Sequence, residues 1–196
     1  MSKSNLLVWM HSNEVKNGCV LGNLSGIDSI YDLNEGVSFE GRFPSDAKYS
    51  LHADFPNNLV LTDNLINSDG LMVVSSRLKV NLENRGLKDV EYHSVEIRDH
   101  KGRVFSKDYF ILHPVKPVEC LNHEASGANA SLILPSVIDN VDELVLHEEQ
   151  VPLDRQLFRI AGFPDATLIR RDLAEDLNNA QFTGFRWLEL SDYPEI

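Results

Sequence analysis

One short sequence pattern occurs twice in this chain, 95 positions apart and without a gap. Each copy runs from an apolar stretch, through a polar stretch with leucines four residues apart, to a second apolar stretch; the copies are Leu71–Val95 and Ala166–Leu190. The matching pairs are Val74 and Ile169, Leu78 and Leu173, Leu82 and Leu177, Asn84 and Asn179, Leu87 and Phe182, Val90 and Phe185, and Tyr92 and Trp187. Leucines at i and i+4 share one face of a helix, and short apolar runs beside them are typical of buried strands. The repeat therefore predicts one strand–helix–strand unit used in two places.

The first copy also shows where its helix begins and ends. Ser75 or Ser76 can cap the first turn with a side-chain oxygen, and Gly86 supplies the left-handed residue that ends many helices. Two extended runs follow, at residues 90–98 and 104–112, joined by a short connection that contains Asp99-His100-Lys101-Gly102. Such a connection predicts a β-hairpin.

The rest of the chain predicts more short strands. We expect them at Leu6–Met10, Gly36–Phe43, Val115–Leu121, Ser131–Leu134, Leu144–His147 and Gln156–Ile160, with a turn at Thr62-Asp63-Asn64. Many short strands, mostly antiparallel, with two or three helices indicate an α+β fold. No low-complexity linker divides the chain, so we expect a single domain over residues 1–196. Within it, a division into an N-terminal sub-region at 1–58 and a main region at 59–196 remains open.

The two cysteines and the N-terminus bear on the compartment. Cys19 and Cys120 are far apart and form no C-x-x-C motif, which predicts reduced, buried thiols of an intracellular protein. The first apolar stretch, Leu6–Met10, is too short for a signal-peptide core, and no run approaches the roughly 18 residues that span a bilayer. We therefore expect a cytoplasmic protein.

The charge of the chain is strongly negative and unevenly distributed. The formal net charge is −12, and the segment 117–154 has no Lys or Arg but eight acids, which account for −8 of it. Nucleic acids and anionic membranes need a basic footprint, so neither is an expected partner. An acidic segment would speed the encounter with a basic protein, although a merely solvated acidic face has the same composition.

A search for catalytic and metal-binding motifs finds none. The seven histidines form neither H-x-H nor H-E-x-x-H, and His147-Glu148-Glu149 lacks a second histidine four residues on. His93 lies in a strand pattern, where packing or hydrogen bonding is its expected role. Gly22-Asn23-Leu24-Ser25-Gly26 places its serine one position too late for a nucleophile elbow. The sequence therefore predicts no catalytic residue, no cofactor and no metal ligand.

Five motifs, in order, resemble those of a known bacterial family. Residues 71–83 resemble a strand that runs into V-S-x-x-L-x-x-x-L, and residues 90–97 resemble v-E-f-x-P-V, with Ser94 in place of the proline. Residues 109–115 resemble a Y-y-x-l-N strand, with His113 in place of the asparagine. Residues 156–162 are similar to f-R-l-x-G, and residues 183–187 are similar to a closing l-T-G-x-x-F segment.

This order of motifs, over about residues 59–190, is similar to the immunity-protein domain of bacterial polymorphic toxin systems, immunity family eleven. The resemblance implies an antidote, encoded beside a secreted toxin, that binds the toxin and protects the cell that makes both. It implies no enzymatic role. The shared motifs are packing positions of strands and helices, so no functional residue is carried over from the family.

We therefore expect a toxin-neutralising protein that binds and blocks a cognate toxin, for example a basic nuclease. The residues expected to attract it are Asp139, Asp142, Glu143, Glu148 and Glu149. Two aromatic residues outside the clear strand patterns, Phe163 and Tyr193, are expected as surface anchors, because buried aromatic side chains dominate many interfaces. The sequence leaves monomer and homodimer open.

Two other classes of function remain open at this point. One is a small-molecule hydrolase or transferase of unrecognised type, for which a pocket between the two halves should hold a histidine and an acid with shifted pKa values. The other is a self-associating adaptor whose edge strands pair between subunits, for which a large apolar patch should repeat by two-fold symmetry.

Overall fold

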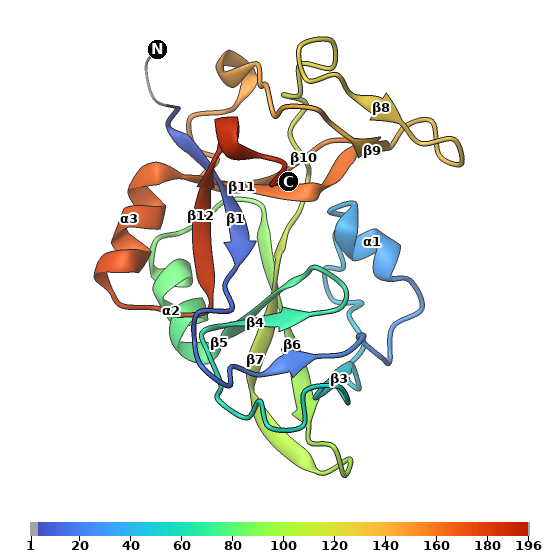
Figure 1. Cartoon of the computed structure of the whole chain (residues 1–196), viewed down its shortest axis with the longest axis vertical. Coiled ribbons are helices and arrows are strands. Elements are labelled where there is room, and N and C mark those ends of the chain that lie inside the picture. Colours follow the sequence, from blue (N-terminus) through green and yellow to red (C-terminus); the bar gives the residue numbers. More distant parts are fainter. Residues whose placement is uncertain (1–3, 196) are drawn as a thin grey trace.

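The strands described by the structure form three sheets. The structure is a computed structural model that describes residues 4–195, and Figure 1 shows a four-stranded sheet in the upper half and a six-stranded sheet in the lower half. The four-stranded sheet has the order β10 (Leu157–Ile160), β11 (Phe163–Arg170), β1 (Leu6–His11) and β12 (Phe185–Glu189). The six-stranded sheet has the order β2 (Val20–Leu21), β4 (Asn64–Asn67), β5 (Met72–Ser75), β7 (Val104–Pro114), β6 (Val90–Arg98) and β3 (Lys48–Ser50). The small third sheet pairs β8 (Asn129–Ala130) with β9 (Ile138–Asn140).

Few helices accompany these strands. The α-helices are α1 (Ile30–Asn34), α2 (Ser76–Asn84) and α3 (Arg171–Asn179), and the 3-10 turns are η1 (Glu148–Gln150) and η2 (Leu190–Asp192). The predicted α+β class is confirmed. Among residues 4–195, no helix has the length and apolar character needed to cross a membrane.

The repeated strand–helix–strand unit is confirmed as β5–α2–β6 and β11–α3–β12. In each copy a third strand lies between the two strands of the unit and runs antiparallel to both: β7 in the first copy and β1 in the second. The outer strands of each copy are therefore parallel to each other. The inserted strand follows the first copy directly but comes from the other end of the chain in the second.

The ends of α2 form as the sequence predicts. The Ser75 side chain accepts a hydrogen bond from the backbone N–H of Leu78 at 3.2 Å, and Gly86 has a φ of +65° just beyond the helix. The predicted hairpin forms as well. Asp99 closes its turn by accepting hydrogen bonds from the backbone N–H groups of Lys101 and Arg103. Its carboxylate also accepts a hydrogen bond from the Arg103 guanidinium at 2.8 Å. The guanidinium bond, together with these backbone bonds, lowers the pKa of Asp99 to about 2.

Strand alternation divides the interior into three apolar clusters. Along β1, Leu7 and Trp9 point to one face of the four-stranded sheet, whereas Leu6 and Val8 point to the other. The first face meets α2, α3 and the inner face of the six-stranded sheet in a shared core. This core contains the matched residues of both copies, Val74, Leu78 and Leu82 with Ile169, Leu173 and Leu177, each at most 1% exposed.

Several expected strands did not form. Gly36–Phe43 is irregular, because Gly36 (φ +68°) is packed against Pro117 and the segment bonds to the side chain of Glu91 instead of a neighbouring strand. Val115–Leu121 makes only two isolated bridges, one between Val118 and Ile160 and one between Leu121 and Leu146. Ser131–Leu134 is bent, and Leu144–His147 makes one bridge through Leu146. The expected turn at Thr62-Asp63-Asn64 leads directly into β4, which begins at Asn64.

Both cysteines are free and buried, as the sequence predicts. Cys19 lies in the cluster on the outer face of the six-stranded sheet and Cys120 in the cluster on the outer face of the four-stranded sheet. Burial raises the pKa of Cys19 to about 11 and that of Cys120 to about 12. Thiols held protonated in this way are poor nucleophiles.

Candidate functional site

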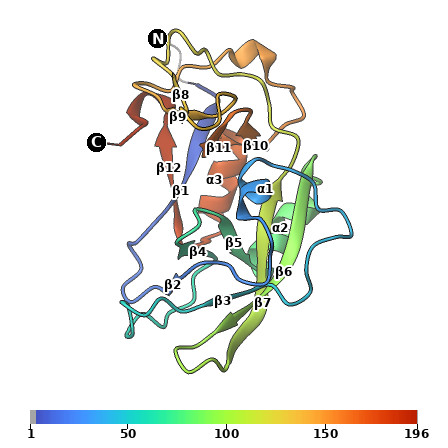
Figure 2. The same ribbon diagram turned by 90° about the vertical axis from the view of Figure 1, so that its right-hand side faces the viewer.

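The acidic segment 117–154 covers one end of the molecule. It lies at the top of Figures 1 and 2, and the β6–β7 hairpin points to the opposite end. Val118, Leu121, Leu144 and Val151 anchor it in the core on the outer face of the four-stranded sheet. The segment is therefore fixed by apolar burial, although it contains little regular structure.

The acids of this segment face solvent. All eight are exposed, and they comprise Glu119, Glu124, Asp139, Asp142, Glu143, Glu148, Glu149 and Asp154. Asp154 pairs with Lys88 at 2.5 Å, and Glu149 lies 3.3 Å from His147. Among residues 4–195, no Lys or Arg forms an ion pair with the other six. The segment therefore presents a largely uncompensated negative field.

The same segment exposes apolar side chains. Leu132, Ile133 and Leu153 are 99%, 87% and 91% exposed, the highest values among the large hydrophobic residues described. Leu132 and Ile133 lie in the loop between β8 and β9, where Asp139 follows on β9. Aliphatic side chains held fully in water gain nothing for the fold, so this loop is a candidate contact surface. This loop was not expected from the sequence, because its apolar run is typical of a strand.

The two expected aromatic anchors behave differently. Phe163 was expected at the surface, and this is wrong: its ring is 1% exposed, because residue 163 begins β11 and pairs with Ile160 in the core. Tyr193 is partly buried against the same cluster, with its ring centroid 6.1 Å from that of Phe163 in an edge-on contact. Phe163 therefore packs against Tyr193 from inside the core and cannot itself contact a partner.

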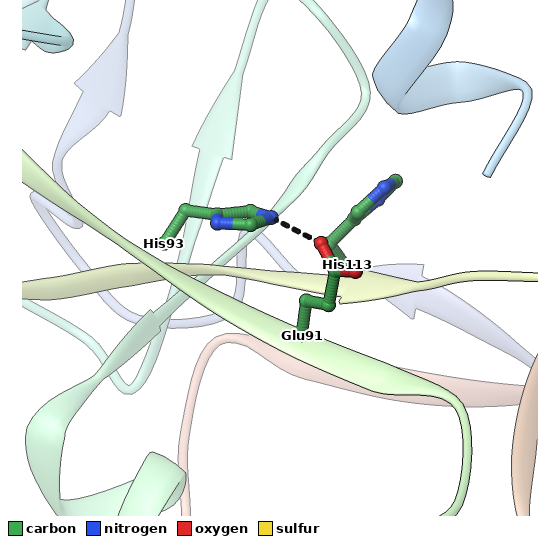
Figure 3. Close-up of side chains that lie close together, drawn as sticks. All are labelled: Glu91, His93 and His113. Carbon is green, nitrogen blue, oxygen red and sulfur yellow. Dashed lines mark ion pairs between the residues drawn. The ribbon is translucent and has the colours of Figure 1, made fainter. Parts of the chain in front are cut away.

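A second polar site lies on the six-stranded sheet, where Glu91, His93 and His113 converge (Figure 3). Glu91 and His93 are two residues apart on β6, so their side chains point to the same face of the sheet. His113 on β7 is paired directly with Glu91 and lies on that face as well. The ligand atoms of the three side chains lie within 4.8 Å of one another, and Nε2 of His93 is 3.1 Å from Oε2 of Glu91. No local motif marked these residues, since they come together only through strand pairing.

Irregular loop 36–43 closes over this cluster. The backbone N–H of Phe39 donates to Oε2 of Glu91 at 3.0 Å, and the Ser38 hydroxyl donates to Oε1 of Glu91. The Phe43 ring stacks on His93 with centroids 4.3 Å apart, and Nε2 of His113 bonds to the carbonyl of Val37 at 2.9 Å. Every member of the cluster is thus held by the loop.

The environment fixes the charge states of the cluster. Burial lowers the pKa of His113 to about 4, although the bond to Val37 opposes the shift, and burial also lowers the pKa of His93. Burial alone would raise the pKa of Glu91, but hydrogen bonds from Ser38 and Phe39 outweigh it and the net pKa is lowered. At neutral pH the site therefore holds two neutral imidazoles and one carboxylate.

The cluster does not have the order of a nucleophilic triad. In a triad the histidine lies between the nucleophile and the acid. Here the carboxylate of Glu91 lies between Ser38 and His93. The cavity beside it, of about 460 Å³, is lined by Glu91 and His93 together with Asp89 and Lys116.

The cleft between the two halves is small. Its volume is about 140 Å³, below the roughly 300–1,000 Å³ of typical ligand sites. It contains His11, whose pKa burial lowers, and Asp165, whose pKa burial raises, beside Arg159, which is itself only 3% exposed. A histidine and an acid with shifted pKa values are thus present, but in a space too small for an ordinary small-molecule substrate.

Comparison with known proteins agrees with the resemblance seen in the sequence. A search of curated proteins found no match. A family model, described as an immunity protein family (Imm11), matches residues 27–192. The match begins well before residue 59 and so includes loop 36–43 as well as both repeat copies. Because it covers most of the chain, the protein belongs to the Imm11 immunity protein family.

Proposed function

We propose that this protein neutralises a cognate secreted toxin by binding it through the acidic segment 117–154, in the cytoplasm of the cell that makes both. Membership of an immunity family supports the toxin as partner. The choice of surface rests on one observation. The segment that has no Lys or Arg also exposes the three most solvent-accessible large hydrophobic side chains described, Leu132, Ile133 and Leu153.

This combination suits a protein interface. A stable interface buries about 800 Å² on each partner, with an apolar centre and a polar rim. Leu132 and Ile133 would enter an apolar pocket of the toxin, and Asp139, Asp142 and Glu143 follow in the chain as rim charges. Burying one aliphatic side chain contributes about 1.5–3 kcal/mol, so two of them provide a useful share of binding energy.

The acids would act mainly on the rate of association. Charges of one sign raise the rate of encounter with an oppositely charged partner by about 10- to 1,000-fold at low salt. The expected partner surface is therefore basic, as is the nucleic-acid site of a nuclease. Covering that site would block the toxin sterically, without any chemistry by the immunity protein.

The first test is capture of the partner. The tagged protein is purified from the native bacterium while the neighbouring genes are expressed, and co-eluting proteins are identified by mass spectrometry. A single stoichiometric partner that is toxic when expressed alone, and harmless when co-expressed with this protein, supports the proposal. Recovery of this protein alone contradicts it.

A charge-matched pair of variants then tests the surface. The first variant replaces the five acids expected to attract the toxin with their amides: Asp139, Asp142, Glu143, Glu148 and Glu149. The control replaces five exposed acids elsewhere: Glu14, Asp28, Asp46, Asp54 and Glu175. Both variants lose five negative charges. The proposal expects association with the captured partner to slow about tenfold or more at low salt in the first variant only. Equal rates in the two variants would move the interface to another face.

A further inference from the structure

We propose that Glu91, His93 and His113 form a binding site for one zinc ion, with the carboxylate and one nitrogen of each imidazole as ligands. This site is independent of the acidic segment and of the proposed toxin interface. Two imidazoles and a carboxylate are a ligand set that proteins use for Zn²⁺ and related divalent metals.

The donor atoms already have nearly the spacing that a zinc ion requires. Ligands at about 2.0–2.1 Å from a tetrahedral ion lie about 3.4 Å from one another. Nε2 of His93 and Oε2 of Glu91 are 3.1 Å apart, and all three donors lie within 4.8 Å of one another. A side-chain shift of about 1 Å at His113 would therefore complete the three-ligand arrangement. Strands β6 and β7 place all three on one sheet face, so no backbone change is needed.

The tautomer of His113 also favours metal binding. Its Nε2 lies 2.9 Å from the carbonyl oxygen of Val37, which can only accept, so Nε2 carries the proton and Nδ1 carries the lone pair. Metal-binding histidines commonly donate their other ring N–H to a backbone carbonyl in this way. The carboxylate of Glu91 is likewise oriented, by Ser38 and by the backbone of Phe39.

One nitrogen of the cluster, Nδ1 of His113, has no hydrogen-bond partner among residues 4–195. His113 is fully buried, so solvent does not reach this atom. A buried polar atom without a partner is destabilising and rare in a folded protein. A metal ion held also by Glu91 and by Nε2 of His93, which already lie 3.1 Å apart, would satisfy it.

Occupation would fasten loop 36–43 to the sheet. Val37, Ser38 and Phe39 each bond to a ligand residue, so a bound ion would connect the loop to β6 and β7 through all three. The cavity beside Glu91 and His93 leaves room for water as a fourth ligand. A structural role for the metal follows, in which the ion orders the loop.

The test is zinc binding to the full-length protein after treatment with EDTA and removal of the chelator. Titration with ZnCl₂ by calorimetry should give one site per chain, and excess zinc should raise Tm by about 5 °C or more. Co²⁺ in place of zinc should give the strong visible absorption of a low-coordinate site. Failure of the wild-type protein to bind zinc with one-to-one stoichiometry would overturn the proposal.

Variants locate the ion. Glu91→Gln and His93→Gln should each weaken zinc binding by more than about 100-fold, since loss of an outer-shell partner alone costs 10- to 100-fold. Ser38→Ala, which removes only such a partner, should weaken it by about tenfold. Glu91 and His93 both line the cavity, so replacing either one should not disrupt the core. Urea unfolding in EDTA verifies that each variant is folded.

The control is the pair of the partly buried His147 and the exposed Glu149, whose side-chain atoms lie 3.3 Å apart. His147→Gln removes this second His–carboxylate pair and should leave zinc affinity, stoichiometry and the Co²⁺ spectrum unchanged. If His147→Gln abolishes binding while His93→Gln retains it, the ion lies at the acidic segment and the proposed site is wrong.

Discussion

Asp63 and Thr183 are 120 residues apart in the chain and are joined by three hydrogen bonds. The backbone N–H and the hydroxyl of Thr183 lie 3.0 Å and 3.2 Å from Oδ2 of Asp63, and the N–H of Asp63 lies 3.3 Å from Oγ1 of Thr183. The same carboxylate accepts from Ser75 and Arg77 at the start of α2. Asp63 therefore connects the helix of the first repeat copy to the loop that precedes the last strand of the second.

We expect Asp63→Ala to lower the free energy of unfolding by about 3 kcal/mol. Hydrogen bonds to a charged group contribute about 1.5–3 kcal/mol each, and the substitution removes the acceptor that Thr183, Ser75 and Arg77 share. Urea unfolding at pH 7 measures the change. The matched control is Asp176→Ala, which breaks the exposed Asp176–Arg85 pair (2.6 Å) and should cost less than about 1 kcal/mol. Equal losses in the two variants would contradict the connecting role of Asp63.

Gly184 cannot be replaced at this junction. It has a φ of +91°, and a Cβ atom there would lie 2.1 Å from the carbonyl oxygen of Asn64. We expect Gly184→Ala to cost more than about 4 kcal/mol or to prevent folding, because neither backbone can move without disturbing the core. Gly86→Ala is the control, since Gly86 also has a positive φ (+65°) but nothing lies within 4 Å of its Cβ position. It should cost only the left-handed strain of about 1–2 kcal/mol.

The repeat could be predicted from the sequence because burial repeats with the period of the element. Leu78 and Leu82, like Leu173 and Leu177, recur every four residues on one helix face, and all four are buried. The expected strand at Gly36–Phe43 failed for a non-local reason. Its backbone bonds to Glu91, a partner more than fifty residues away that no window of sequence includes. The sequence predicts Asn64 as a turn residue, but it is fully buried. Its side-chain amide is satisfied there by donating a hydrogen bond to the carbonyl of Gly184.

The candidate sites were predictable to different degrees. Exposure of the acids in segment 117–154 follows from composition, since isolated carboxylates are rarely buried. The cluster of Glu91, His93 and His113 depends on register. Arg98 pairs with Val104, and a hairpin that kept this register without a bulge would pair Glu91 with Ile111. Two register shifts between Val95 and Arg98 change the pairing, so that Glu91 pairs with His113. Bulges of this kind leave no clear mark in the sequence.

The stability of the protein should fall as the pH is lowered from about 6.5 to 4. Burial lowers the pKa of His113 from 6.5 to about 4, so in this range the unfolded chain binds a proton at this residue that the folded chain does not. A shift of this size corresponds to about 3 kcal/mol, fully present above pH 6.5 and lost toward pH 4. The lowered pKa values of His93 and Glu91 act in the same direction.

Urea unfolding in EDTA at several pH values from 7.5 to 4.5 measures this loss. His113→Asn should flatten the pH dependence, whatever its effect on stability at pH 7.5. His100→Gln, at an exposed turn position, should leave the pH dependence unchanged. A slope that is the same in His113→Asn and in the wild-type protein would show that His113 is not held neutral by the fold.

The exposed tip between β8 and β9 should matter for partner binding and not for folding. Leu132 and Ile133 are 99% and 87% exposed, so replacing both with serine removes almost no buried area, and the free energy of unfolding should change by less than about 0.5 kcal/mol. If the tip enters a pocket of the captured toxin, the double variant should bind at least about tenfold more weakly, mainly through faster dissociation. Val80→Ser and Val104→Ser, which remove exposed side chains (53% and 51%) on α2 and β7, provide the control. Surface plasmon resonance with the captured partner compares the variants. Weaker binding by the control alone would place the interface near α2 and β7 and not on the acidic segment.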